Sequence, residues 1–227
     1  MEEEFRGKKV FITGASRGIG KTIKEMLEDK GALVCAPLRQ ELDLANVENV
    51  NEYLSLNQDS SYDIMIFCAG INRKAPIELL TDDNLQETFQ VNLFSSIKII
   101  QYYIEKMKMQ SKGKIIFISS LYAIVSKEER ISYSCSKNAV TGLVKTLALE
   151  CAKSNICVNA VAPGYVLTEM TYKNLTEDEI ENIRKNIPMN RLQDKEEIAE
   201  LVLFLASDKN KSITGQLISV DGGFLCR

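Results

Sequence analysis

The stretch I-S-Y-S-C-S-K at residues 131–137 places a tyrosine four residues ahead of a lysine, among mostly small side chains. On a helix, positions i and i+4 share one face about one turn apart, so Tyr133 and Lys137 can touch. A lysine ammonium beside a phenol stabilises the tyrosinate and lowers the phenol pKa from its usual value of about 10. Such a pair could supply an acid or a base near neutral pH.

The Y-x-x-x-K spacing alone does not identify a site, because Tyr102 and Lys106 repeat it. The chain contains no histidine, which excludes Ser-His and Cys-His mechanisms. Its six cysteines form no C-x-x-C pair and mostly lie in apolar runs, so we expect no metal site and a reducing, cytoplasmic compartment. Proton chemistry in this chain must therefore use Tyr, Lys, Cys or carboxylate groups.

The elements that must position these residues alternate along the chain. Strand-like apolar runs are predicted at 8–14, 31–37, 62–70, 113–120, 156–164 and 216–221, and helices at about 19–30, 46–56, 81–109, 133–153 and 194–207. Continuous apolar strands between amphipathic helices indicate a parallel sheet covered on both faces. The pattern predicts an α/β, doubly wound Rossmann-type fold that forms a single domain over residues 1–227.

The segment after the second predicted strand is unusually short. Almost no residues separate Arg39 from the strand-like E-L-D-L at 41–44. Neighbouring parallel strands need a crossover of roughly a dozen residues or more. We therefore expect E-L-D-L to form a loop or a vestigial edge, which leaves a sheet of about six strands.

The first predicted strand runs into T-G-A-S-R-G-I-G, residues 13–20, and then into a helix. Gly14, Gly18 and Gly20 allow a tight turn and close approach of a pyrophosphate, which the free N–H groups of the helix N-terminus can bind. At the end of the second strand, where NAD enzymes use an acid for the ribose diol, this chain has Arg39. Together with Arg17 it suits a 2′-phosphate, which favours NADP(H) over NAD(H).

The motifs taken together resemble the single-domain short-chain dehydrogenase/reductase family almost from end to end. They are T-G-A-S-R-G-I-G at 13, C-A-G at 68, V-N-L at 91, I-S-S at 118, Y-S-C-S-K at 133 and P-G-Y-V-L-T at 163. The C-terminal part, from I-P-M-N-R-L-Q-D-K-E-E-I-A to I-T-G-Q-L-I-S-V-D-G-G, is most similar to the 3-oxoacyl-(acyl-carrier-protein) reductase branch.

The resemblance implies a catalytic set of Asn92, Ser120, Tyr133 and Lys137. Ser120 ends a strand thirteen residues before Tyr133, and no such serine precedes Tyr102 at that distance. In the family the tyrosine donates a proton to the reduced carbonyl oxygen, and the serine hydrogen-bonds the same oxygen. The lysine lowers the tyrosine pKa and binds the nicotinamide ribose, while the asparagine sits at a helix kink and holds a water that leads to the lysine.

The resemblance also implies an NADP(H) site and a substrate lid at about 165–190. The implied cofactor residues are Gly14, Ser16, Arg17, Gly18, Ile19, Gly20, Arg39, Asp43, Leu44, Cys68, Ala69, Gly70, Tyr133, Lys137, Pro163, Gly164, Val166 and Thr168. Cys68 stands where the family usually has asparagine, so we expect a local stability cost there. The shortened segment after Arg39 leaves the position of Asp43 open.

Composition restricts the partners. The net charge is −3 with no basic block, which does not favour nucleic acid, and the apolar runs are too short to span a membrane. The start, Met-Glu-Glu-Glu, is acidic where a secretory signal would be basic. The helices at 84–109 and 133–153 are apolar on more than one face, which favours a homo-oligomer, a dimer or a tetramer.

The leading hypothesis is an NADPH-dependent reductase of 3-oxoacyl thioesters, with an acyl carrier protein as a candidate partner. The alternative is an oxidoreductase of another alcohol or ketone, such as a sugar or a secondary-metabolite intermediate. A more distant alternative is a non-catalytic NADP(H)-binding regulator, although such proteins commonly lose the tyrosine or the lysine. The segments expected to contact substrate, at 71–76, 121–131 and 165–175, are mixed in character and name no substrate.

Overall fold

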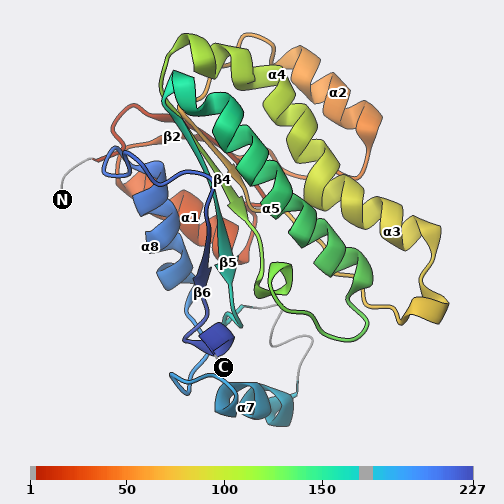
Figure 1. The fold of residues 1–227 in the computed structure, drawn as a ribbon. Coiled ribbons are helices and arrows are strands. Elements are labelled where there is room, and N and C mark those ends of the chain that lie inside the picture. Colours follow the sequence, from red (N-terminus) through yellow and green to blue (C-terminus); the bar gives the residue numbers. More distant parts are fainter. Residues whose placement is uncertain (1–3, 169–175, 227) are drawn as a thin grey trace.

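A parallel sheet of six strands forms the centre of the molecule, in the order β2-β1-β3-β4-β5-β6 (Figure 1). This computed structural model describes residues 4–168 and 176–226. The strands are β1 (Lys9–Thr13), β2 (Leu33–Cys35), β3 (Ile64–Phe67), β4 (Gly113–Ile118), β5 (Ile156–Pro163) and β6 (Leu217–Val220). The order reverses between β1 and β3, and in such sheets ligands bind at the carboxyl ends of the strands beside this point.

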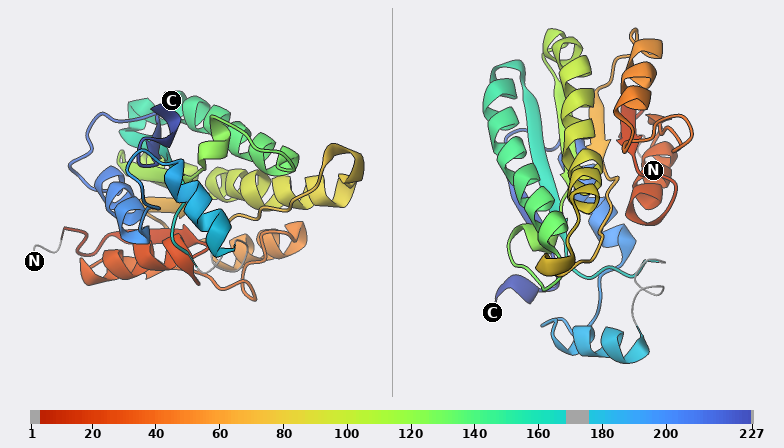
Figure 2. Two further views of the ribbon diagram at one scale, coloured as in Figure 1. Left: turned by 90° about the horizontal axis from the view of Figure 1, so that it is seen from below. Right: turned by 90° about the vertical axis from the view of Figure 1, so that its right-hand side faces the viewer.

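Helices cover both faces of the sheet (Figures 1 and 2). Successive side chains of a strand point to opposite faces, so Ile64 and Ile66 of β3 pack with helices α1 and α8, while Met65 and Phe67 pack with α2, α4 and α5. Within the described ranges, none of the helices is long and apolar enough to cross a bilayer. The helices are α1 (Gly18–Asp29), α2 (Val47–Leu56), α3 (Asp82–Phe89), α4 (Ser95–Met109), α5 (Ile131–Cys151), α7 (Glu177–Lys185) and α8 (Lys195–Ala206).

The helix predicted at 81–109 is interrupted by one π-helical turn, Gln90–Phe94, which separates α3 from α4. Asn92 lies in this turn and is buried. A π turn widens the helix by one residue and is frequent at functional sites. Here it holds Asn92, whose side chain bonds Ile71 in the segment after β3 and Ser136 of α5.

The prediction that E-L-D-L forms no regular strand is confirmed. Residues 36–46 form a loop after the three-residue strand β2, and α2 follows directly. Leu42 of this loop is buried in the core beneath α2 and α4. The loop therefore takes the place of a further strand at this edge of the sheet.

The segment expected as a substrate lid contains a helix that the sequence reading did not predict. Helix α7 begins after a capping box, in which the Thr176 hydroxyl accepts from the Glu179 N–H at 3.2 Å and the Glu179 carboxylate accepts from the Thr176 N–H at 2.8 Å. In Figure 1, α7 lies beyond the end of β6. Residues 169–175 of the expected lid lie outside the described residues.

Candidate active site

A cleft of about 750 Å³ opens at the carboxyl ends of the strands. It is lined by the turn after β1, the loops after β2 and β3, the start of α5 and the segment after β5. Ser120, Tyr133 and Lys137 line it, whereas Asn92 lies behind its wall. Every residue predicted to bind the cofactor lines this cleft: Gly14, Ser16, Arg17, Gly18, Ile19, Gly20, Arg39, Asp43, Leu44, Cys68, Ala69, Gly70, Tyr133, Lys137, Pro163, Gly164, Val166 and Thr168.

The glycine-rich turn leaves room for a ligand at the start of α1. Gly14 has a φ of +73°, and a Cβ placed there would lie 2.6 Å from the Ala69 nitrogen, so no larger residue fits. Gly18 has a φ of +57° and begins α1, where the first N–H groups have no partner within the helix. This cradle fits a pyrophosphate held by a helix N-terminus.

Cys68 does not supply the hydrogen bonds of the family's asparagine, and another contact joins the strand ends. The Ala69 N–H donates to the Thr13 hydroxyl at 3.4 Å, which links the end of β1 to the segment after β3. Burial raises the pKa of the Cys68 thiol to about 12, although the nearby Lys137 charge opposes the shift. The thiol therefore stays protonated near neutral pH.

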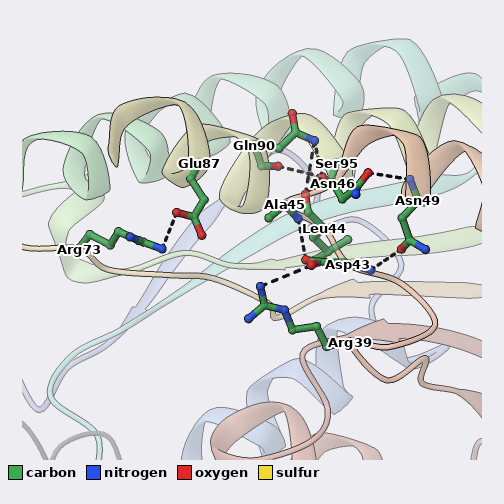
Figure 3. A network of polar contacts seen from close by, with 10 residues as sticks. All are labelled: Arg39, Asp43, Leu44, Ala45, Asn46, Asn49, Arg73, Glu87, Gln90 and Ser95. Atoms are coloured by element: carbon green, nitrogen blue, oxygen red, sulfur yellow. Dashed lines mark hydrogen bonds and ion pairs between the residues drawn. The ribbon is translucent and has the colours of Figure 1, made fainter. Parts of the chain in front are cut away.

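The end of the cleft expected to hold the adenosine carries both a cation and an anion. The Arg39 guanidinium lies 3.4 Å from the Asp43 carboxylate (Figure 3), and both residues line the cleft. The structure therefore settles where the shortened segment places Asp43. The Arg39 side chain is 77% exposed, so its ion pair with Asp43 lies at the surface.

Partly buried hydrogen bonds fix the loop that carries Asp43 (Figure 3). The Asn49 side chain accepts from the Asp43 N–H at 2.6 Å, and Asp43 accepts from the Ala45 N–H at 3.1 Å. The Ser95 hydroxyl, at the start of α4, donates to the Leu44 carbonyl at 2.6 Å. The loop is thus attached to both α2 and α4.

Tyr133 faces the cleft from the first turn of α5, beside Ser120 at the end of β4. Burial raises the pKa of the Tyr133 phenol above its usual value, while the hydrogen bond with Ser120 and the charge of Arg130 lower it. The expectation that Lys137 lowers this pKa is not met in this structure, because the net direction is upward and Lys137 is not among the causes. A raised pKa keeps the phenol protonated, which is the form that donates a proton.

Lys137 is buried beneath Tyr133, with its ammonium 5.7 Å from the centre of the tyrosine ring. The ammonium donates to the Ile118 carbonyl at 2.8 Å. Burial lowers the pKa of Lys137 to about 8. Its charge is therefore held at the bottom of the cleft, against the last residue of β4.

Asn92 is placed to position the segment next to Lys137. Its side chain accepts from the Ile71 N–H at 2.8 Å and donates to the Ile71 carbonyl at 3.0 Å and to the Ser136 hydroxyl at 3.0 Å. A Cβ at Gly70 would lie 3.3 Å from the Asn92 oxygen and 3.4 Å from the Lys137 ammonium. Only glycine leaves the space between these two groups open.

The second Y-x-x-x-K pair does not line the cleft. Tyr102 is 38% exposed on α4, and the Lys106 ammonium donates to the Ser60 carbonyl at 3.1 Å in the loop after α2. Lys106 thus tethers a loop to a helix, which is a structural task.

The substrate end of the cleft holds residues that the sequence reading did not single out: Tyr122, Arg130 and Tyr165. The Tyr122 and Tyr165 hydroxyls lie 3.2 Å apart, and the Tyr122 ring meets the Tyr133 ring edge-on at 6.2 Å. One signal was available for Arg130, because it precedes Tyr133 by three residues and so lies one helical turn away. No sequence signal distinguishes Tyr122 or Tyr165.

Known proteins resemble this chain over nearly its whole length. The family model described as Enoyl-(Acyl carrier protein) reductase matches residues 6–225. The chain belongs to the short-chain dehydrogenase/reductase family. A 3-oxoacyl-[acyl-carrier-protein] reductase of Buchnera aphidicola is 34% identical, with 94% of this chain and 95% of the relative covered.

Two solved structures of this family show the same fold. A 4-hydroxyisoleucine dehydrogenase complexed with NADH has a TM-score of 0.92 at 27% identity, covering 97% of this chain and 100% of its own. A gluconate 5-dehydrogenase from Burkholderia cenocepacia, in complex with NADP and tartrate, also has a TM-score of 0.92 at 27% identity, covering 99% and 98%. As a short-chain dehydrogenase/reductase, the chain is an NAD(P)-dependent oxidoreductase of CH-OH or carbonyl groups.

Proposed function

We propose that the protein is an NADPH-dependent carbonyl reductase in which Tyr133 is the general acid. One observation supports this proposal most strongly: Ser120, Tyr133 and Lys137 line the same cleft as the glycine-rich turn. A bound NADPH supplies the hydride that the carbonyl carbon receives.

The chain's own residues supply the proton and its path. The Tyr133 phenol, protonated because burial raises its pKa, donates to the carbonyl oxygen as negative charge develops there. The Ser120 hydroxyl, which hydrogen-bonds Tyr133, positions that oxygen. Lys137 lies beneath the Tyr133 ring, and Asn92 lies on the other side of Gly70 from Lys137. Both residues are proposed to help return a proton to Tyr133 after the reaction.

The proposed substrate is a 3-oxoacyl thioester, and the relatives named as 3-oxoacyl-[acyl-carrier-protein] reductases support it. An acyl carrier protein is then the proposed macromolecular partner. Arg17 and Arg39 at the adenosine end support the choice of NADPH. Residues 165–190, including α7, are proposed as the lid over this substrate.

Replacement of Tyr133 by phenylalanine tests the proposal directly. We expect Tyr133→Phe to lower kcat for NADPH oxidation with a 3-oxoacyl thioester by roughly 100- to 10,000-fold, the usual contribution of a general acid. Binding of NADPH should change little, because the ring remains. Absorbance at the reduced nicotinamide band measures turnover, and fluorescence titration measures binding.

Tyr102→Phe is the matched control, since Tyr102 has the same spacing to a lysine but lies outside the cleft. Full activity of Tyr102→Phe together with loss in Tyr133→Phe would support the assignment. The opposite result would contradict it.

A second candidate is an oxidoreductase of a polar hydroxy or oxo compound other than an acyl thioester. The paired Tyr122 and Tyr165 hydroxyls and the adjacent Arg130 make the substrate end polar, and one structural neighbour is a gluconate 5-dehydrogenase. A regulator that binds NADP(H) without catalysis is less well supported, because all four predicted catalytic residues are present.

A further inference from the structure

Arg130 is a buried arginine at the substrate end of the cleft. It directly precedes α5, lines the cleft and is only 8% exposed. Among residues 4–168 and 176–226, no group accepts a hydrogen bond from its Nε or Nη1 atom, and both atoms are buried. Unpaired buried N–H groups of a charged side chain cost free energy, and native proteins rarely leave them so. Both atoms are shielded from solvent even with the cleft empty, so an acceptor on a bound molecule would satisfy them once the Arg130 side chain turns further toward the cleft that it lines.

Arg130 lies next to the group proposed to donate the proton. It precedes Tyr133 by one helical turn, and its positive charge acts on the phenols of both Tyr133 and Tyr122, lowering the pKa of each against the effect of burial. A molecule whose carbonyl oxygen meets Tyr133 therefore lies in the positive field of Arg130.

The acidic residues that line the described part of the cleft are already paired. Asp43 pairs with Arg39 at 3.4 Å, and Glu87 pairs with Arg73 at 2.5 Å. Neither carboxylate is thus available to satisfy Arg130.

Two further cations share the substrate end with Arg130, namely Lys74 and Lys127. Both lysines act on Glu179 of α7, whose carboxylate also caps that helix. A wall with an excess of positive charge attracts anions to this end of the cleft.

We infer that Arg130 forms a carboxylate-binding subsite beside the reacting carbonyl, and that the protein has a further activity, the reduction of short oxo acids with a free carboxylate. A guanidinium and a carboxylate are both planar and pair through two parallel hydrogen bonds. This inference rests on the proposed hydride transfer at the same site. The hydride adds to the carbonyl carbon, the C=O π bond opens, and Tyr133 protonates the oxygen and regains a proton from solvent, so that NADPH, an oxo acid and one proton give NADP⁺ and a hydroxy acid.

A matched pair of substrates tests this subsite: acetoacetate, and acetoacetamide as its neutral counterpart of nearly the same shape. We expect Arg130→Met to raise KM for acetoacetate by roughly 10- to 100-fold, the usual effect of losing hydrogen bonds to a charged group. The KM for acetoacetamide should change by less than about threefold, since it has no charge to lose. Arg130→Lys should fall between, because it keeps the charge but not the planar fork.

Lys211→Gln is the control for charge, because it removes one positive charge from an exposed loop before β6, outside the cleft. It should leave both KM values unchanged. Arg130→Met should remain folded, with a Tm equal to or above that of the parent, since it removes a buried unpaired charge. Equal changes of KM for acetoacetate and acetoacetamide in Arg130→Met would overturn the inference.

Binding of malonate to the NADPH-loaded protein, measured by calorimetry, separates this inference from the proposed function. Malonate binding that is lost in Arg130→Met would support the subsite. A lack of turnover with every carbonyl compound would reject the reductase but would not affect this conclusion about the subsite. The subsite would be rejected if the parent does not bind malonate, or if Arg130→Met binds it as tightly as the parent does. Turnover of a 3-oxoacyl thioester alongside either result would leave the reductase standing.

Discussion

Burial moves the pKa values of Tyr133 and Lys137 in opposite directions, because it disfavours the charged form of each. The phenol pKa rises, and the ammonium pKa falls to about 8. At neutral pH the phenol is therefore neutral and the ammonium charged. This is the protonation state that a reductase needs, with the proton on the donor before the hydride arrives.

The pKa of Lys137 predicts a pH dependence of stability. Below pH 8 the lysine is charged in both the folded and the unfolded chain, so the folded state carries the full cost of burying it. Between about pH 8 and the ordinary lysine pKa near 10.4, the unfolded chain binds more protons and the free energy of unfolding rises with pH. Without added cofactor, we expect the parent to gain stability relative to Lys137→Met across this window.

Urea denaturation at a series of pH values from 7 to 10 would measure this difference. Taking the difference between the two proteins removes the contributions of all other titrating groups. A difference that stays constant from pH 7 to 10 would show that the lysine pKa is not depressed.

Arg39 and Asp43 together predict a change of cofactor preference. We expect the parent to bind NADPH roughly tenfold or more tightly than NADH, as one or two charge-assisted hydrogen bonds to a phosphate provide. In Arg39→Ala the Asp43 carboxylate loses its partner at 3.4 Å and repels the 2′-phosphate. The ratio of the two Kd values should then shrink or reverse, as fluorescence titration would detect. Equal affinities in the parent would contradict the role given to the arginines.

At the scale of elements, the loop between β2 and α2 shows how a short segment holds part of a cofactor site. Ser95 is fully buried, and its hydroxyl donates to the Leu44 carbonyl at 2.6 Å. The bond links the first turn of α4 to the residue next to Asp43. The π turn and the residue after it thus contact both ends of the cleft. Asn92 bonds Ile71 near Lys137, and Ser95 bonds Leu44 beside Asp43.

Ser95→Ala should weaken this end of the site. The variant loses the shorter of two hydrogen bonds to the Leu44 carbonyl, while the Gln90 side-chain amide still donates to it at 3.4 Å. We expect a loss of about 0.5–1.5 kcal/mol of unfolding free energy, and loosening of the loop should raise the Kd for NADPH several-fold. Ser96→Ala is the matched control, since its hydroxyl is also buried but donates to the Leu93 carbonyl at 2.7 Å. If both variants bind NADPH equally well, the loop does not depend on Ser95.

Most elements were predictable because their signals are local. The apolar strands and amphipathic helices fall within a few residues of their predicted positions, and the loop at 41–44 followed from a limit on crossover length. Helix α7 was missed although its start, T-E-D-E, matches a capping box. No local pattern marks the π turn, so 81–109 was predicted as one helix, and only the resemblance to the family placed a kink at Asn92, where the turn lies.

The candidate site was less completely predictable. The residues predicted to bind the cofactor and to act in catalysis stand in recognisable motifs, and the cleft brings them together except for Asn92 behind its wall. The burial of Arg130 and the contact of Tyr122 with Tyr165 depend on how loops far apart in sequence pack. The pKa of Tyr133 likewise depends on desolvation, which spacing to a lysine does not reveal.

At the scale of the whole molecule, apolar side chains remain exposed on the outer side of α4 and α5. Leu149 is 82% exposed, Ile97 39% and Tyr102 38%. Helices that face solvent seldom carry several such residues unless another surface covers them. We expect a homo-oligomer, a dimer or a tetramer, in which a second copy of this chain packs on these helices.

Size-exclusion chromatography with light scattering would determine the assembly. Leu149→Glu should weaken it, whereas Leu56→Glu, at an equally exposed leucine of α2 (78%), should not. A parent protein that runs as a monomer would contradict the expectation.

The short strand β2 has a consequence for how the molecule behaves at high concentration. An edge strand presents unpaired N–H and C=O groups on which another chain can add a strand, and this is a common start of aggregation. Here that edge is three residues long, Leu33–Cys35, and the chain then leaves it through Pro37. Three residues extend only about 10 Å, which is too short to template a stable intermolecular sheet. The shortness of β2 thus protects this edge of the sheet against edge-to-edge growth.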